Sequence, residues 1–184
     1  AYTYNEPVIY YEFMLDVVKK IKEKGLKNVV VTNGFINLEP MQELMNYIDA
    51  FSIDLKGFTN EFYKKYTSSS FDPIKETLKQ IRKNDKFLEV INLVIPTLND
   101  DAGEFEEMMK WMRDNLGENT VLHISRYFPS YKSTIEATPS SKLKEFYNLA
   151  SRYLNYVYVG NIMLDEGSDT YCHLCGALLV ERKG

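Results

Sequence analysis

The chain has 184 residues but only two cysteines, two histidines and one tryptophan. The cysteines, Cys172 and Cys175, form a single close pair, which excludes a disulfide-stapled secreted scaffold. No apolar run approaches the ~18 residues that a membrane span needs, and no signal-peptide pattern opens the sequence. The 22 basic residues against 26 acidic ones include no basic block of the kind that binds nucleic acid. We therefore expect a soluble cytoplasmic protein that binds neither nucleic acid nor membrane.

Apolar residues make up 45% of the chain, which is enough for an ordinary globular core. Strand-like and helix-period segments alternate along most of it. The predicted strands cover residues 28–32, 50–55, 87–95, 121–127 and 156–159, and the predicted helices 8–24, 38–48, 72–81, 104–116 and 141–153. Five such repeats predict an α/β fold with parallel strands and right-handed crossovers, either an open doubly wound sheet or all or part of a (βα) barrel.

The alternation stops near residue 160. We predict one domain over residues 1–160 and a short appendage over residues 161–184, which carries the two cysteines. The chain begins at Ala1 in a sequence that already looks like a strand, and it ends shortly after a Cys-His-Leu-Cys knuckle that has no second knuckle. From these ends we expect a piece of a longer protein.

Polar side chains occur where the predicted strands end. Asp54 and Lys56 share one face of a strand whose other face is apolar. Ligands of parallel α/β proteins bind at the carboxyl ends of the strands, so these positions predict a binding site. The positions at the strand exits are Asn5, Glu6, Thr32, Asn33, Asp54, Lys56, Thr97, Asn99, Asp100, Asp101, Ser125 and Arg126.

Several of these positions also have a purely structural interpretation. Asp54 and Lys56 could form a salt bridge, and Asn99, Asp100 or Asp101 is better explained as a helix N-cap. Thr32-Asn33-Gly34 could be only a turn, because Asn-Gly readily adopts positive φ. His123 could be a hydrogen-bonded structural side chain. Their joint placement at one end of the strands nevertheless favours a site.

Five short segments occur in the order of a known family: residues 2–7 (Tyr-Thr-Tyr-Asn-Glu-Pro), 31–34 (Val-Thr-Asn-Gly), 53–56 (Ile-Asp-Leu-Lys), 94–96 (Val-Ile-Pro) and 156–161 (Tyr-Val-Tyr-Val-Gly-Asn). Together they resemble the radical S-adenosylmethionine (SAM) enzymes related to pyruvate formate-lyase activating enzyme, and most of all the AmmeMemoRadiSam-type members. The resemblance spans essentially the whole chain.

The resemblance implies a partial (βα)6 barrel and an oxidoreductase. In such enzymes a three-cysteine loop holds a 4Fe–4S cluster that chelates SAM, and an external electron donor reduces it. SAM is then cleaved to a 5′-deoxyadenosyl radical, which abstracts hydrogen from a substrate; in some members the substrate is a glycine of a partner protein. No cysteine occurs before residue 172, so this chain lacks the loop. We expect the isolated chain to be inactive.

The resemblance also assigns site residues. The Gly-Gly-Glu-Pro stretch that holds the SAM amino group corresponds to residues 4–7, where Glu6 is retained and both glycines are replaced, by Tyr4 and Asn5. Asp54 and Lys56 stand in an intact Asp-Leu-Lys, which implies contacts to the methionine moiety or ribose of SAM.

The family's Asp-Thr-Asn-Gly is altered at its first residue. Val31 replaces the aspartate before Thr32 and Asn33, so a cation there would lack that carboxylate. Asn92, His123 and Arg126 are implied pocket residues.

The Cys172–Cys175 pair has the spacing of half a four-thiolate zinc or iron site, and the alternative is two free thiols. Two other functions stay open besides the enzyme. One is a binding or scaffold domain without redox chemistry. The other, a phosphate-using barrel enzyme, is the least favoured, because the chain has no glycine-rich phosphate loop.

Overall fold

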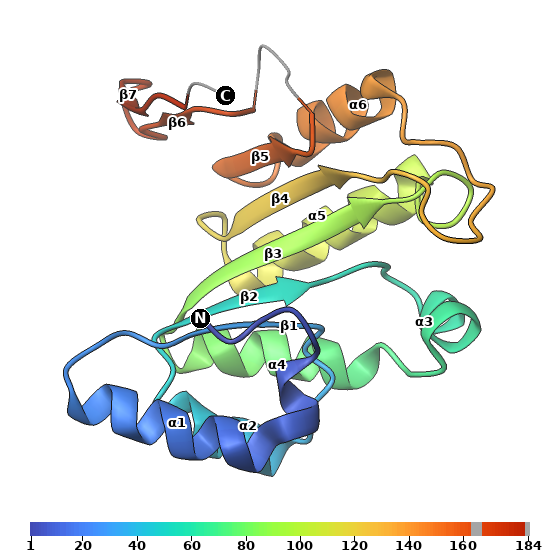
Figure 1. The fold of residues 1–184 in the computed structure, drawn as a ribbon. Helices are drawn as coiled ribbons and strands as arrows, with labels where there is room; N and C mark the ends of the chain where they lie inside the picture. The colour runs from blue at the N-terminus through green and yellow to red at the C-terminus, as the bar shows by residue number, and fades with distance from the viewer. Residues whose placement is uncertain (163–166, 183–184) are drawn as a thin grey trace. The chain divides into compact units, whose positions relative to one another are not determined.

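A computed structural model of the protein describes residues 1–162 and 167–182 (Figure 1). Residues 163–166 and 183–184 of the predicted appendage lie outside the described residues. The chain divides into two compact units. Unit 1 comprises Ala1–Leu55 and Thr59–Val90, and unit 2 comprises Lys56–Phe58 and Ile91–Gly184. The predicted division at residue 160 stays a prediction.

Five strands form one parallel sheet in the order β1-β2-β3-β4-β5, and each is separated from the next along the chain by at least one helix (Figure 1). This confirms the predicted α/β fold; closure into a (βα)6 barrel stays a prediction. The strands are β1 Val29–Thr32, β2 Ala50–Asp54, β3 Phe87–Val94, β4 Val121–Arg126 and β5 Tyr156–Gly160. The helices are η1 Pro7–Tyr10, α1 Tyr11–Glu23, α2 Leu38–Met45, α3 Asn60–Thr67, α4 Asp72–Lys83, α5 Ala102–Leu116 and α6 Ser140–Ala150. Two short strands, β6 Thr170–Tyr171 and β7 Leu178–Val180, form a separate antiparallel hairpin.

The core of unit 1 lies between its strands and its amphipathic helices. Met14 and Val18, four residues apart on α1, are both fully buried, as the helical period predicts. Phe51 and Ile53 of β2 and Ile81 of α4 are buried as well. Each such side chain contributes about 1.5–3 kcal/mol by its removal from water.

Unit 1 also pairs a residue near the start of the chain with β1. Tyr2 forms an isolated parallel bridge with Val30, and its phenol donates to Asn28 at 2.9 Å. Tyr2 is therefore the last paired residue before the chain leaves the sheet toward Glu6.

Unit 2 is held together by packing between α5 and α6. The rings of Phe105 and Phe146 stack with centroids 3.9 Å apart. Met108 and Met112 of α5 are buried as well. Asp101 is the N-cap of α5, because its carboxylate accepts the Glu104 N–H at 2.8 Å. The N-cap interpretation of residues 99–101 is therefore correct, with Asp101 as the capping residue.

Two features of the fold differ from the sequence prediction. The first helix begins with a 3-10 turn, η1, which Glu6 caps by accepting the Val8 N–H at 3.3 Å. The second is α3, which the sequence prediction missed. Thr59 caps it, but it is short and mostly polar, and its buried residues, Phe62 and Tyr63, are adjacent rather than spaced by a helical turn.

Candidate functional site

The carboxylate of Glu6 is the centre of a hydrogen-bonded cluster in unit 1. Its Oε1 accepts the Val8 N–H and the hydroxyl of Thr32. Its Oε2 accepts the Asn33 N–H at 2.8 Å. Thr32 is buried and Glu6 is half-buried, so the two oxygens are held at the edge of solvent. A carboxylate has about four acceptor sites, which leaves Oε2 able to accept a further donor.

The turn after β1 presents the donors of this cluster. Asn33 Oδ1 accepts the Phe35 N–H at 2.8 Å, and Thr32 Oγ1 accepts the Gly34 N–H at 3.2 Å. Gly34 has φ +74°, and a Cβ on it would lie 3.2 Å from Ile53 Cγ2. The turn interpretation of Thr32-Asn33-Gly34 is thus correct, and the same turn directs the Asn33 N–H at Glu6.

The backbone before Glu6 has an unusual conformation. Tyr4 has φ +79°, in the left-handed region that a bulky residue avoids, and its side chain is fully exposed. Asn5 is exposed too. The backbone at Tyr4 therefore has a left-handed conformation that glycine adopts readily.

Asp54 lies at the same end of unit 1 as this cluster. It follows Ile53, which is paired in register with Thr32, and it is half-buried at the end of β2. The exits of three neighbouring segments therefore bring Glu6, Thr32, Asn33 and Asp54 to one edge, as the sequence predicted from parallel strands.

The remaining predicted residues belong to unit 2. Lys56 is half-buried, and its backbone oxygen accepts from the side chain of Asn99. The same amide group donates to Leu93 O at 2.8 Å, and its Oδ1 accepts the Ile95 N–H at 2.6 Å. Asn99 thus fixes the loop after β3. Asn92, on β3, is buried.

Arg126 and His123 both lie on β4 and contact side chains or backbone of unit 2. Arg126 Nε donates to Thr138 O at 2.9 Å, and its guanidinium lies 4.7 Å from the centroid of the Phe128 ring. The His123 ring stacks on Tyr158 with centroids 5.4 Å apart. These contacts fix both side chains; their role as pocket residues stays a prediction.

The Cys172–Cys175 knuckle closes the tip of the β6–β7 hairpin. Cys172 N–H donates to Ala177 O, and Gly176 N–H, at φ +71°, donates to Cys172 O, both at 2.8 Å. Backbone N–H groups of Cys175 and Leu174 stabilise the thiolate and lower the pKa of Cys172. Among residues 1–162 and 167–182 no group of three or more His, Cys, Asp or Glu side chains could hold a metal ion. Cys172 and Cys175 are free thiols in the described part of the chain, and a metal at the knuckle stays a prediction.

The amino-acid sequence matches the family model of the radical SAM superfamily over residues 1–112. The chain belongs to the radical SAM superfamily. Within the part of the chain that the structure describes, no helix has the length and apolar character to cross a membrane.

Three known proteins illustrate the similarity. An uncharacterized protein of Methanocaldococcus jannaschii is 44% identical over 184 residues, which cover 99% of this chain and 54% of the relative. The 4-hydroxyphenylacetate decarboxylase activating enzyme of Clostridium scatologenes is 24% identical over 166 residues, 88% of this chain and 53% of that enzyme. The chain thus spans about half the length of these two curated relatives. A domain of pyruvate-formate lyase-activating enzyme from Bacteroides vulgatus has the same fold, with a TM-score of 0.74 at 16% identity, covering 87% of this chain and 97% of that domain.

Proposed function

We propose that the protein carrying this chain is a radical SAM enzyme and that this chain contributes most of its SAM-binding surface. The observation that carries the proposal is the Glu6 carboxylate, held by Thr32, Asn33 and Val8 at the strand exits of a radical SAM chain. A carboxylate fixed by three donors and open to one more fits the ammonium group of SAM.

The chain's residues suit the other groups of this zwitterionic sulfonium as well. Tyr4, two residues before Glu6, has a left-handed backbone at the position where the resemblance implies a glycine, and we assign its backbone to the SAM site as well. We assign Asp54 to the ribose or methionine moiety and Lys56 to the methionine carboxylate, because a cation and a hydrogen-bond acceptor are the complements of these groups. We also keep Asn92, His123 and Arg126 of unit 2 as predicted SAM-binding residues.

When bound and reduced by an external electron donor, SAM supplies a 5′-deoxyadenosyl radical for hydrogen abstraction. A 4Fe–4S cluster of the family type needs three cysteines in one loop, and this chain has two, at 172 and 175. The residues of this chain therefore do not fit the cluster. We propose that they bind and orient SAM, that the 184 residues alone do not cleave it, and that the protein acts in the cytoplasm.

For the substrate we propose a protein, specifically a glycine that becomes a radical. The support is the similarity to activating enzymes, among them that of 4-hydroxyphenylacetate decarboxylase. For the Cys172–Cys175 knuckle we propose half of a zinc or iron site, supported by the N–H groups that stabilise a thiolate there.

The double variant Asp54→Leu with Lys56→Met tests the SAM site. It is made in the cluster-reconstituted protein that carries this chain, and SAM affinity and melting temperature are both measured. A structural salt bridge could be replaced by apolar residues with stability kept, because buried pairs often only offset their own desolvation. A SAM contact would instead lose about 1.5–3 kcal/mol per charged hydrogen bond, roughly a tenfold to hundredfold loss of affinity. Unchanged SAM affinity would remove both residues from the site.

A further inference from the structure

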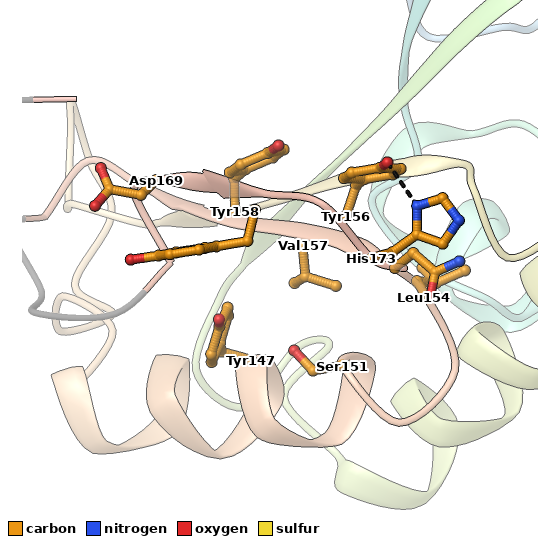
Figure 2. A pocket seen from close by; sticks show the side chains of 10 residues that line it. Tyr147, Ser151, Leu154, Tyr156, Val157, Tyr158, Asp169 and His173 are labelled. Carbon is orange, nitrogen blue, oxygen red and sulfur yellow. Dashed lines mark hydrogen bonds between the residues drawn. The ribbon is translucent and has the colours of Figure 1, made fainter. Parts of the chain in front are cut away.

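Unit 2 contains a cavity of about 270 Å³ against β5, the end of α6 and the β6–β7 hairpin (Figure 2). In Figure 2, Tyr147 of α6 and Ser151, which directly follows α6, lie across the gap from Tyr158 and Val157 of β5, with Asp169 at one end and His173 at the other. The residues that line the cavity are Tyr147, Ser151, Leu154, Asn155, Tyr156, Val157, Tyr158, Asp169, Tyr171 and His173. None of them belongs to the proposed SAM site.

The walls of this cavity are rich in aromatic rings: four tyrosines and one histidine line it. Two of the phenols are anchored by hydrogen bonds. Tyr156 Oη bonds to His173 Nδ1 at 2.9 Å, and Tyr158 Oη bonds to Thr170 Oγ1 at 2.7 Å. Anchored rings lose little freedom when a ligand arrives, so the cavity is preorganised.

The charge of the lining favours a cation. Among the described residues that line the cavity, Asp169 carries the formal negative charge, and there is neither lysine nor arginine. The backbone N–H of Arg182 donates to Asp169 Oδ1 at 2.7 Å and thereby holds the carboxylate in place. The faces of the tyrosine rings are negative as well, so rings and carboxylate attract positive charge together.

One of these rings already contacts a cation of the chain itself. The guanidinium of Arg182 lies 5.0 Å from the centroid of Tyr158, while its Nη1 donates to Ser168 O and Thr170 Oγ1, both at 2.8 Å. Arg182 does not line the cavity, so it leaves the interior to another group.

We propose that this cavity binds a small organic cation, an alkylammonium or quaternary ammonium group, with Asp169 and the tyrosine rings as its partners. Aromatic cages with a carboxylate recognise such groups by cation–π attraction. A volume of about 270 Å³ is at the small end of ligand sites, and therefore suits one ammonium group rather than a large ligand. The group could belong to a free amine or to a methylated lysine side chain, which share this chemistry.

The test compares choline with its neutral isostere, 3,3-dimethylbutan-1-ol, each titrated into the 184-residue chain at constant ionic strength and followed by NMR. We expect saturable binding of choline and at least about tenfold weaker binding of the alcohol, which corresponds to about 1.4 kcal/mol. Equal affinity of the two compounds, or no saturable binding of choline, would overturn the proposal. Neither result depends on SAM, so it does not bear on the proposed function.

Variants locate the binding. Asp169→Asn keeps an acceptor for the Arg182 N–H but removes the charge, and Tyr147→Leu removes one ring; each should weaken choline binding about threefold to tenfold. The matched control is Asp16→Asn, at an exposed position of α1 in unit 1, which should change nothing. If Asp169→Asn binds choline as the parent does, the assignment is wrong.

The source of the cation is distinguished by a second probe, Nα-acetyl-trimethyllysine methylamide. Binding about tenfold tighter than that of choline would assign the cavity to a lysine side chain of a peptide. Equal or weaker binding would assign it to a free amine.

Discussion

The carboxylate of Glu6 accepts the backbone N–H of Asn33 at 2.8 Å, although the two residues are 27 positions apart in the chain. The contact joins the segment after the Tyr2 bridge to the turn after β1. Thr32, the last residue of β1, bonds to the same carboxylate. Glu6 therefore has a structural role in unit 1 apart from any ligand, and the two roles need separate measurements.

Glu6→Gln and Thr32→Val separate the structural role. Each single change should lower the free energy of unfolding by about 1–3 kcal/mol, because Thr32→Val removes the hydrogen bond to the carboxylate and Glu6→Gln removes the charge that strengthens it. The two changes should not add, since they act on the same contact; the expected coupling exceeds about 0.5 kcal/mol. Urea unfolding of the parent, both single variants and the double variant measures it. Strictly additive effects would show that the contact contributes nothing to stability.

Tyr4→Gly should stabilise the chain. The left-handed conformation at φ +79° destabilises the folded chain by about 1–2 kcal/mol when the residue is bulky, but not when it is glycine. Against this, glycine loses more chain entropy on folding, which costs about 0.5–1 kcal/mol. A net gain of roughly 0.5–1 kcal/mol is expected. Tyr4→Ala is the control, because it removes the same exposed ring and keeps the conformational cost. Equal stability of the glycine and alanine variants would argue against backbone strain at this position.

Asp49 should make the stability of unit 1 depend on pH. Burial raises the pKa of its carboxyl, but the Asn28 N–H at 2.9 Å and the amines of Lys22 and Lys27 outweigh burial and lower it. A lowered folded-state pKa gives stability that is present above the ordinary value near 4 and is lost as the pH falls through the folded-state pKa.

The matching variant is Asp49→Asn. At pH 7 it should lower the free energy of unfolding by about 1–2 kcal/mol. Most of this loss comes from the hydrogen bond to the Asn28 N–H, because both lysines are substantially exposed and their ion pairs with Asp49 are screened by solvent. The difference in stability between parent and variant, measured by thermal unfolding, should become smaller below about pH 4. A gap that is constant from pH 7 to pH 2 would contradict the assignment.

Cys172 should be more acidic than an ordinary thiol. Because N–H groups of Cys175 and Leu174 lower its pKa, its alkylation by iodoacetamide should reach half-maximal rate at a lower pH than an ordinary thiol. Site-resolved mass spectrometry measures the two cysteines separately. In 6 M guanidinium chloride these local bonds are lost, so the Cys172 profile should move to higher pH; a Cys172 profile that is the same with and without denaturant would refute the prediction.

Much of the site was readable in the sequence because its signals are local. The Asn33-Gly34 turn, the Asp101 cap and the buried α1 and α5 faces follow from residue type and helical period. The grouping of the residues that follow the strands could be predicted, because parallel strands end at one edge of a sheet. The sequence placed Glu6 and Thr32 at neighbouring exits but did not show that they bond to each other.

The amino-acid sequence by itself determined the α/β alternation, the turn chemistry and the radical SAM resemblance, since these depend on residues near one another in the chain. Only the tertiary structure decided which distant groups meet. The Tyr2–Val30 bridge brings Glu6 to Asn33, and Arg126 Nε is directed at Thr138 O. The tyrosine-lined cavity likewise joins α6, β5 and the β6–β7 hairpin. No periodicity encodes such contacts, because they arise from packing between elements whose separation in the chain carries no local signal.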